Sequence, residues 1–222
     1  MSLFIDTANL EEIVEIAKWG VISGVTTNPK IISKEPGISF KERILEICDI
    51  VDGPISVELV NENKDDMIKE AEEYSSWHKN IVIKVPMSCM GLEVIKILER
   101  EKNIRTNVTV MMAANQAFLA ALAGGTYLSL FIGRIGDMGY DGLQVIKDTK
   151  KMLIEQQLSS KIIVGSIRHL MDINKSILAG ADIVTVPYKF FKQMASNPKS
   201  AETINEFNSI WRDMREKGLI KL

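Results

Sequence analysis

The alternation of short apolar segments with helical ones constrains the fold of this chain more than any other feature. Eight runs rich in valine and isoleucine are each followed by a segment of helical character, and no linker interrupts the series. Because strands that alternate with helices form right-handed βαβ units, the pattern predicts a parallel sheet. The expected strands are Leu3–Asp6, Gly24–Thr27, Ile55–Leu59, Ile81–Val85, Ile104–Thr109, Tyr127–Phe131, Ile162–Ser166 and Asp182–Val186. The expected helices are Leu10–Trp19, Phe40–Val51, Lys64–Trp77, Gly91–Glu101, Ala113–Ala123, Gly142–Gln157, Leu170–Ala179 and Lys189–Ala195.

Eight such units within 222 residues fit a closed (β/α)8 TIM barrel, which we expect to form a single domain over residues 1–222. An open, doubly wound sheet is the rival architecture. It calls for the fingerprint GxGxxG after the first strand, where this chain reads Ile5-Asp6-Thr7-Ala8-Asn9. The glycines that follow the sixth strand, Gly133, Gly136, Gly139 and Gly142, come too late for that motif and predict a flexible loop near a site.

A further helix is expected over Ala201–Lys217, outside the eight units. It carries an apolar stripe of Ile204, Phe207, Trp211 and Met214 at helical spacing. Such a stripe either covers the outside of its own barrel or docks on a neighbouring copy.

Composition excludes several classes of function. The net charge is −2 and no basic stripe predicts a nucleic-acid partner. No apolar stretch is long enough to cross a membrane, and two cysteines make no disulfide framework, so we expect a cytoplasmic protein. His78 and His169 have no second ligand at metal-binding spacing, so neither a metal nor another cofactor is expected.

Lys84 stands within the apolar run Ile81-Val82-Ile83-Lys84-Val85-Pro86. A lysine in a buried strand either extends its amine to water at the strand end or keeps it desolvated. Desolvation disfavours the ammonium form, which is how a lysine becomes a nucleophile that forms a Schiff base. Taken alone, Lys84 fits the first interpretation better than the second, because most lysines in such strands reach water at the strand end.

Polar side chains at the ends of the other strands favour the second interpretation. The ends of parallel barrel strands meet at one rim, where barrel enzymes hold their catalytic groups. Each residue also has a structural explanation by itself, as turn former, edge residue or surface charge. Their convergence is what predicts a site, and its members are Asp6, Asn28, Glu58, Asn107, Thr109, Ser129, Phe131, Arg134, Ser166 and Arg168.

These segments resemble the small-subunit transaldolase family, which also contains the fructose-6-phosphate aldolases. The matching motifs run through the chain in the family's order: Phe4-Ile5-Asp6-Thr7-Ala8-Asn9, Gly24-Val25-Thr26-Thr27-Asn28-Pro29, Ile83-Lys84-Val85-Pro86, Thr106-Asn107-Val108-Thr109, Gly133-Arg134 and Ser166-Ile167-Arg168. The loop Val60–Asn63 departs from the family's pattern. The resemblance implies a (β/α)8 barrel, metal-free Schiff-base chemistry on sugar phosphates, and homo-oligomers, pentamers or decamers, whose C-terminal helices exchange between neighbours.

The resemblance also implies a role for each residue. Lys84 forms the imine, Asp6 is the base for carbon–carbon cleavage, and Glu58 with Thr109 and a water moves protons during imine formation. Asn28, Asn107 and Ser129 form hydrogen bonds with the hydroxyls of the dihydroxyacetone unit. Arg134, Ser166 and Arg168 bind the phosphate, since guanidinium groups suit that charge.

Two alternatives remain open. The aldolase branch of the family carries Gln at the position of Glu58 and Tyr at that of Phe131, so this chain is closer to the transaldolase branch. An aldolase would release free dihydroxyacetone. A non-catalytic sugar-phosphate-binding barrel would need the arginines and no activated lysine. A different class I aldolase, such as a deoxyribose-phosphate enzyme, is disfavoured because its flanking motifs differ.

Overall fold

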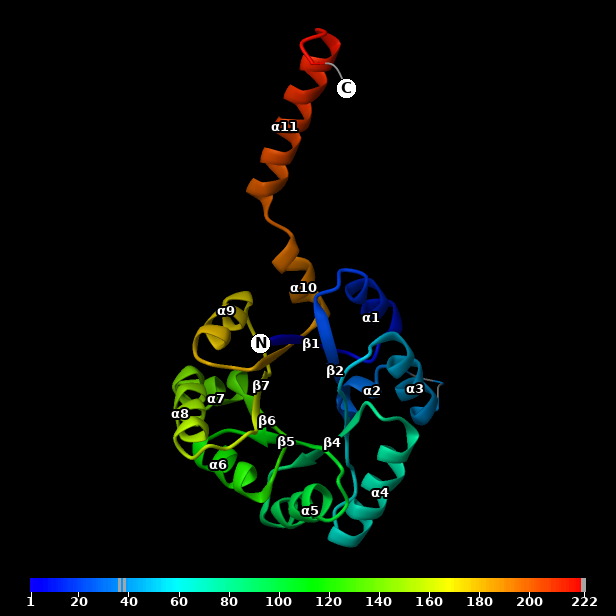
Figure 1. Cartoon of the computed structure of the whole chain (residues 1–222), viewed down its shortest axis with the longest axis vertical. Coiled ribbons are helices and arrows are strands. Elements are labelled where there is room, and N and C mark those ends of the chain that lie inside the picture. The colour runs from blue at the N-terminus through cyan, green and yellow to red at the C-terminus, as the bar shows by residue number, and fades with distance from the viewer. Residues whose placement is uncertain (36, 38, 221–222) are drawn as a thin grey trace. The chain divides into compact units, whose positions relative to one another are not determined.

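The eight strands form a closed parallel barrel in which each strand pairs with its neighbours in sequence and β8 pairs with β1 (Figure 1). This computed structural model describes residues 1–35, 37 and 39–220. The strands are β1 (Ser2–Asp6), β2 (Ile22–Thr26), β3 (Ile55–Glu58), β4 (Ile81–Pro86), β5 (Thr106–Met111), β6 (Tyr127–Phe131), β7 (Lys161–Gly165) and β8 (Ile183–Val186). The predicted (β/α)8 barrel is therefore confirmed.

The helices are α1 (Leu10–Ala17), α2 (Pro29–Ile32), α3 (Phe40–Ile50), α4 (Lys64–Trp77), α5 (Cys89–Arg100), α6 (Ala114–Ala123), α7 (Ile132–Asp137), α8 (Gly142–Glu155), α9 (Leu170–Leu178), α10 (Tyr188–Ala195) and α11 (Pro198–Glu216). Those from α1 to α9 follow the strands and surround the barrel, as Figure 1 shows. Several helices have an N-cap residue whose side chain accepts a hydrogen bond from the first turn. The side chain of Asn9, for example, accepts a hydrogen bond from the backbone of Glu12 at the start of α1.

The interior of the barrel is packed with apolar side chains below the rim. Phe4, Val82, Tyr127, Ile163 and Ile183 form one buried cluster although they come from five different strands. Burying a side chain of this size contributes about 1.5–3 kcal/mol, so the cluster holds together strands that are far apart in sequence. The strands also carry buried polar side chains, among them Thr26 at the end of β2 and Thr106 at the start of β5.

One detail of the predicted loops is wrong. Gly133 and Gly136 do not lie in a flexible loop but in helix α7. A Cβ atom on Gly133 would lie 2.1 Å from the carbonyl oxygen of Ser166, to which the amide of Gly133 donates a hydrogen bond of 3.1 Å. This glycine therefore allows α7 to approach the end of β7 closely.

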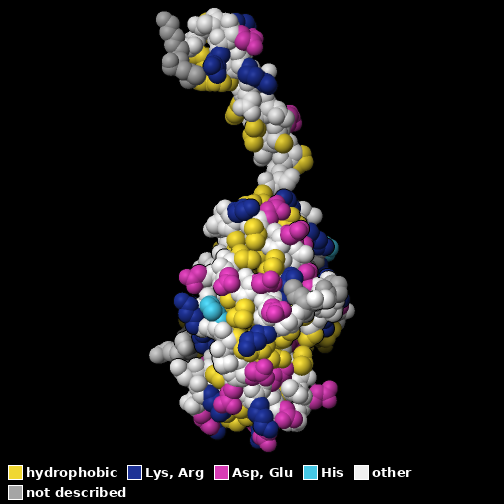
Figure 2. All heavy atoms as spheres, turned by 90° about the vertical axis from the view of Figure 1, so that its right-hand side faces the viewer, with side chains coloured by type: hydrophobic (Ala, Val, Ile, Leu, Met, Phe, Trp, Pro, Cys, Tyr) yellow, Lys and Arg dark blue, Asp and Glu magenta, His cyan; other side chains and the backbone are white. Residues whose placement is uncertain are grey.

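The chain consists of two compact units, Met1–Tyr188, which contains every strand, and Lys189–Leu222. The second unit contains the long helix α11, which confirms the predicted extra C-terminal helix. α11 buries none of its residues, and Ile204, Phe207 and Trp211 are 57%, 64% and 48% exposed. Apolar side chains are visible along this helix in Figure 2. The predicted apolar stripe is therefore real and exposed.

Candidate active site

Pairing of the strands places three of the predicted residues side by side at the carboxyl-terminal rim. Glu58 on β3 is in register with Lys84 on β4, and Lys84 is in register with Asn107 on β5. Each of these side chains comes from a different strand. Their juxtaposition is therefore a property of the closed sheet and not of local sequence.

Lys84 is 4% exposed, and its amine lies inside the rim. Nζ donates hydrogen bonds to Oε2 of Glu58 at 2.8 Å and to the carbonyl oxygen of Thr27 at 3.0 Å. The side chain thus does not extend to water, which was the structural alternative. Two partners, Thr27 directly after β2 and Glu58 on β3, hold its nitrogen at a defined place.

Asp6, at the end of β1, accepts a hydrogen bond of 2.7 Å from the hydroxyl of Thr26. Burial raises the pKa of this carboxyl above its ordinary value of 3.8, and the charge of Glu58 acts in the same direction. The Thr26 hydrogen bond and the charge of Lys84 oppose the shift without cancelling it. A carboxylate with a raised pKa is a stronger base than an exposed aspartate, which suits proton abstraction.

Two polar atoms on β5 are buried without a hydrogen-bond partner among the described residues, Oδ1 of Asn107 and Oγ1 of Thr109. The amide nitrogen of Asn107 donates to the Ser56 hydroxyl at 3.0 Å. The register of β5 with β6 shifts just beyond, and Val110 has a positive φ of 61°, which is uncommon for a β-branched residue. Because buried polar groups are normally paired, these two atoms lack the partner that such groups usually have.

A cavity of about 140 Å³ opens at this rim. Its lining includes Lys84 and six other predicted residues: Asp6, Asn28, Ser129, Phe131, Arg134 and Ser166. Thr26, Gly165 and Thr185 complete it. Sequence analysis did not single out Thr26 and Thr185, whose hydroxyls contact each other. The signal was present, since each is a polar residue in an otherwise apolar strand end.

The two arginines predicted to bind phosphate are placed differently. Arg134 lines the cavity, with its guanidinium carbon 5.6 Å from the centre of the Phe131 ring. Arg168 instead donates to Asp137 at 2.7 Å and lines a neighbouring cavity together with His169. Both arginines are exposed. Of the pair, only Arg134 lies on the cavity of Lys84 in this structure.

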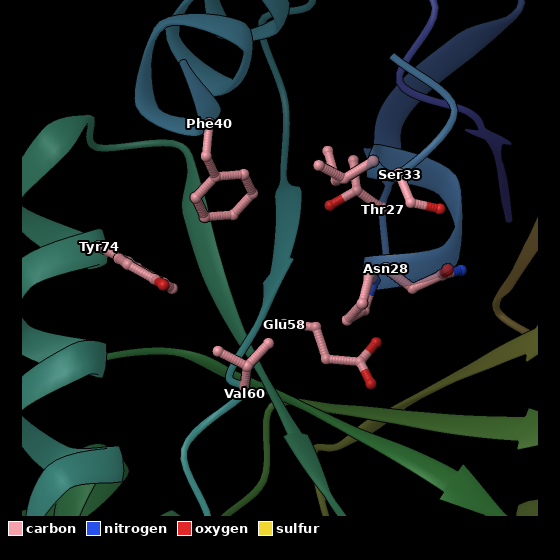
Figure 3. Close-up of a pocket in the computed structure, with 9 residues that line it drawn as sticks. Thr27, Asn28, Ser33, Phe40, Glu58, Val60 and Tyr74 are labelled. Carbon is pink, nitrogen blue, oxygen red and sulfur yellow. The ribbon is translucent and has the colours of Figure 1, made fainter. Parts of the chain in front are cut away.

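A second cavity of about 330 Å³ is lined by Glu58 (Figure 3). Phe40 and Tyr74 face it from α3 and α4, opposite Thr27 and Asn28. Asn28 lines both cavities, and its Oδ1 also accepts a hydrogen bond of 3.0 Å from the amide of Ile31 at the start of α2. The structural interpretation of Asn28 is therefore confirmed, and its role in substrate binding stays a prediction.

Two other classes of site, a metal centre and a membrane span, are not found among the described residues. No group of three or more His, Cys, Asp or Glu side chains there could hold a metal ion. None of the helices described is both long and apolar enough to span a bilayer. Acidic and basic side chains are interspersed on the face drawn in Figure 2.

Comparison with known proteins gives consistent matches over nearly the whole chain. The model of the family "Transaldolase/Fructose-6-phosphate aldolase" matches residues 3–220. A probable transaldolase of Carboxydothermus hydrogenoformans is 46% identical over 215 residues, covering 97% of this chain and 100% of that protein. A probable transaldolase of Clostridium tetani is 47% identical, with the same two coverages. For one of Thermoanaerobacter the identity is 47%, over 96% of this chain and 97% of that protein.

Proposed function

We propose that this chain, which belongs to the transaldolase/fructose-6-phosphate aldolase family, is a transaldolase. It transfers a dihydroxyacetone unit from a ketose phosphate, sedoheptulose 7-phosphate or fructose 6-phosphate, to an aldose phosphate. The names of its relatives support this activity. The observation that carries the mechanism is the buried amine of Lys84, held 2.8 Å from Glu58 at a cavity that Asp6 and Arg134 also line.

The first step forms a Schiff base on Lys84. Its neutral amine attacks the C2 ketone, the carbonyl oxygen takes up a proton, and the resulting carbinolamine loses water to leave a cationic imine. Glu58 is close enough to accept the proton that the amine loses and to return it to the departing hydroxyl. The unpaired hydroxyl of Thr109 holds the water that relays these protons.

The second step breaks the C3–C4 bond. Asp6 removes the proton of the C4 hydroxyl, C4 becomes a carbonyl carbon, and the electron pair of the broken bond moves into the imine to form an enamine. The aldose phosphate leaves while the three-carbon unit stays on Lys84, hydrogen-bonded to Asn28, Asn107 and Ser129. The enamine carbon then attacks the carbonyl carbon of an acceptor aldehyde, and Asp6 returns the proton to the new alkoxide. Water hydrolyses the imine, which releases the product and frees Lys84.

Arg134, Ser166 and Arg168 bind the phosphate in this proposal. Replacing Arg134 or Arg168 with alanine should raise KM for fructose 6-phosphate about tenfold or more, since a hydrogen bond to a charged group contributes about 1.5–3 kcal/mol. Arg168 must leave Asp137 to take part, so the larger effect is expected for Arg134, which already lines the cavity. Steady-state kinetics with free dihydroxyacetone as donor is the control. Equal increases for both donors would remove the arginines from the phosphate site.

The alternative, an aldolase that releases free dihydroxyacetone, differs only in the fate of the enamine. Phe131 lines the cavity and has no hydroxyl to hold water beside the enamine carbon. Phe131→Tyr is expected to shift the partition from transfer towards release about tenfold, which needs only about 1.4 kcal/mol of differential stabilisation. Assays of release and transfer with and without erythrose 4-phosphate measure this ratio.

Phe131→Leu is the matched control, because it alters the ring and adds no hydroxyl. Release should stay low in that variant. If the unmodified enzyme already releases dihydroxyacetone as fast as it transfers it, the aldolase alternative replaces the transaldolase. If no imine forms at all, the chain is a sugar-phosphate-binding barrel without catalysis.

Two further points belong to this proposal. The exposed apolar stripe of α11 supports a homo-oligomer, a pentamer or decamer as the family resemblance implies, in which this helix packs on a neighbouring copy. Cys48 and Cys89 are both free thiols, one buried and one exposed, which supports a reducing, cytoplasmic setting.

A further inference from the structure

Glu70 on α4 is a buried carboxylate whose side chain takes no part in the steps above. It is 7% exposed. Its oxygens accept hydrogen bonds from the amide of Val60 at 3.2 Å, the amide of Asn61 at 3.1 Å, the side chain of Asn61 at 3.0 Å and the hydroxyl of Tyr74 at 2.7 Å. A buried carboxylate this well paired holds its donors firmly, because separating any of them leaves a charge unsatisfied.

The donors lie directly after Glu58 in the chain. β3 ends at Glu58, the amide of Leu59 donates to the carbonyl oxygen of Lys84 at 3.0 Å, and the next two amides donate to Glu70. The backbone that leaves Glu58 is therefore fixed first to β4 and then to α4. These contacts restrict where the Glu58 carboxylate can lie relative to Nζ of Lys84.

Tyr74 connects Glu70 with the cavity of about 330 Å³, because it donates to Glu70 and also lines that cavity. Burial and the neighbouring Glu70 carboxylate raise the pKa of the Tyr74 hydroxyl, so it stays protonated and donates. Its ring packs against Phe40 at 5.5 Å and Trp77 at 4.5 Å between ring centres. Phe40, Val60 and Tyr74 line the cavity beside Glu58, as Figure 3 shows.

We infer that Glu70 is a positioning residue for imine formation, which acts on Glu58 through the Val60–Asn61 segment. A neutral glutamine would accept with one oxygen only and would turn its amide donor towards one of the donors that Glu70 now pairs. The segment would loosen, and Glu58 would spend less time within hydrogen-bond distance of Lys84. The inference rests on the proposed role of Glu58 in that step.

A double-mutant cycle tests the inference, with Glu70→Gln, Glu58→Gln and the double variant made in the full chain. The measured quantity is the rate at which fructose 6-phosphate forms an imine on Lys84, from rapid quenching into borohydride followed by mass spectrometry. Glu70→Gln should slow this rate about tenfold in the unmodified background, since small displacements of a catalytic group have effects of at least that size. In the Glu58→Gln background it should change the rate less than about twofold, because a residue that acts through Glu58 has nothing left to position.

Glu73→Gln is the matched control, since Glu73 is an exposed carboxylate on the same helix and lies outside the Val60–Asn61 contacts. Its rate should equal that of the unmodified chain. If Glu70→Gln fails to fold, Glu70→Asp, which keeps the charge on a shorter side chain, is measured in its place with the same expected pattern.

The outcomes separate this inference from the proposed function. The same loss of rate in both backgrounds, or no loss in either, overturns the role of Glu70 while imine formation on Lys84 stands. Absence of any imine in the unmodified chain overturns the proposed function itself, and the inference with it.

Discussion

Replacing Lys84 with methionine is expected to lower the transfer of the dihydroxyacetone unit by more than about a thousandfold, the scale of losses seen when a nucleophile is removed. Methionine keeps an apolar stem of similar length in the 4%-exposed site, so the barrel should still fold. No other group among the described residues that line the cavity is an amine. Coupled assay of aldose-phosphate formation measures the loss.

Lys96→Met provides the control for this prediction, because Lys96 is an exposed lysine on α5, the helix that follows β4. That variant should transfer at the rate of the unmodified enzyme. Transfer by Lys84→Met at more than about a tenth of that rate would be too fast for a protein without its nucleophile.

Replacing Asp6 with asparagine is expected to slow cleavage about 100- to 10,000-fold, the usual contribution of a general base. Imine formation should survive, because Asp6 acts on the C4 hydroxyl and Glu58 is the group within hydrogen-bond distance of Lys84. Borohydride reduction with fructose 6-phosphate should therefore attach the intact sugar phosphate to Lys84. An adduct of only three carbons, formed at the normal rate, would show that Asp6 is not the base.

The same variant should be at least as stable as the unmodified protein near neutral pH. Because burial raises the pKa of Asp6 in the folded state, the folded protein is more stable with Asp6 protonated than with Asp6 charged. The stability from this group is fully present below the unfolded-state pKa, near 3.8, and is lost as the pH rises through the folded-state value. The advantage of Asp6→Asn should thus shrink as the pH falls, which denaturant midpoints at several pH values measure.

The barrel itself could be predicted because each of its eight units carries a local signal. β-branched runs and helical periodicity depend only on neighbouring residues, and parallel closure follows from their alternation. The short helices α2 and α7 were not predicted, since neither is long enough to show periodicity. The glycines of α7 have a low intrinsic helix propensity, so the sequence does not predict a helix there. The close contact of Gly133 with Ser166 overrides that preference.

Within the site, sequence indicated residue types at strand ends more reliably than their partners. Lys84 was recognisable because a charge interrupts an apolar strand. That its amine meets Glu58 and the Thr27 carbonyl depends on pairing between strands. The hydrogen bond between Arg168 and Asp137 joins the loop after β7 to the end of α7, and no local sequence pattern indicates it.

Glu70 illustrates the same limit. In sequence it belongs to an acidic, solvated-looking stretch of α4, beside Glu72 and Glu73, which are exposed. Only its place behind the Val60–Asn61 segment makes it different. A residue whose role depends on backbone donors from another element carries no pattern of its own.

The most direct test of the central claim is the mass of the product trapped on the unmodified enzyme. Fructose 6-phosphate and borohydride are added together, the protein is digested, and the modified peptide is sequenced by mass spectrometry. The account predicts a reduced three-carbon dihydroxyacetone unit on Lys84, and its disappearance when erythrose 4-phosphate is supplied before the reductant. An adduct on any other lysine, or none at all, would contradict it.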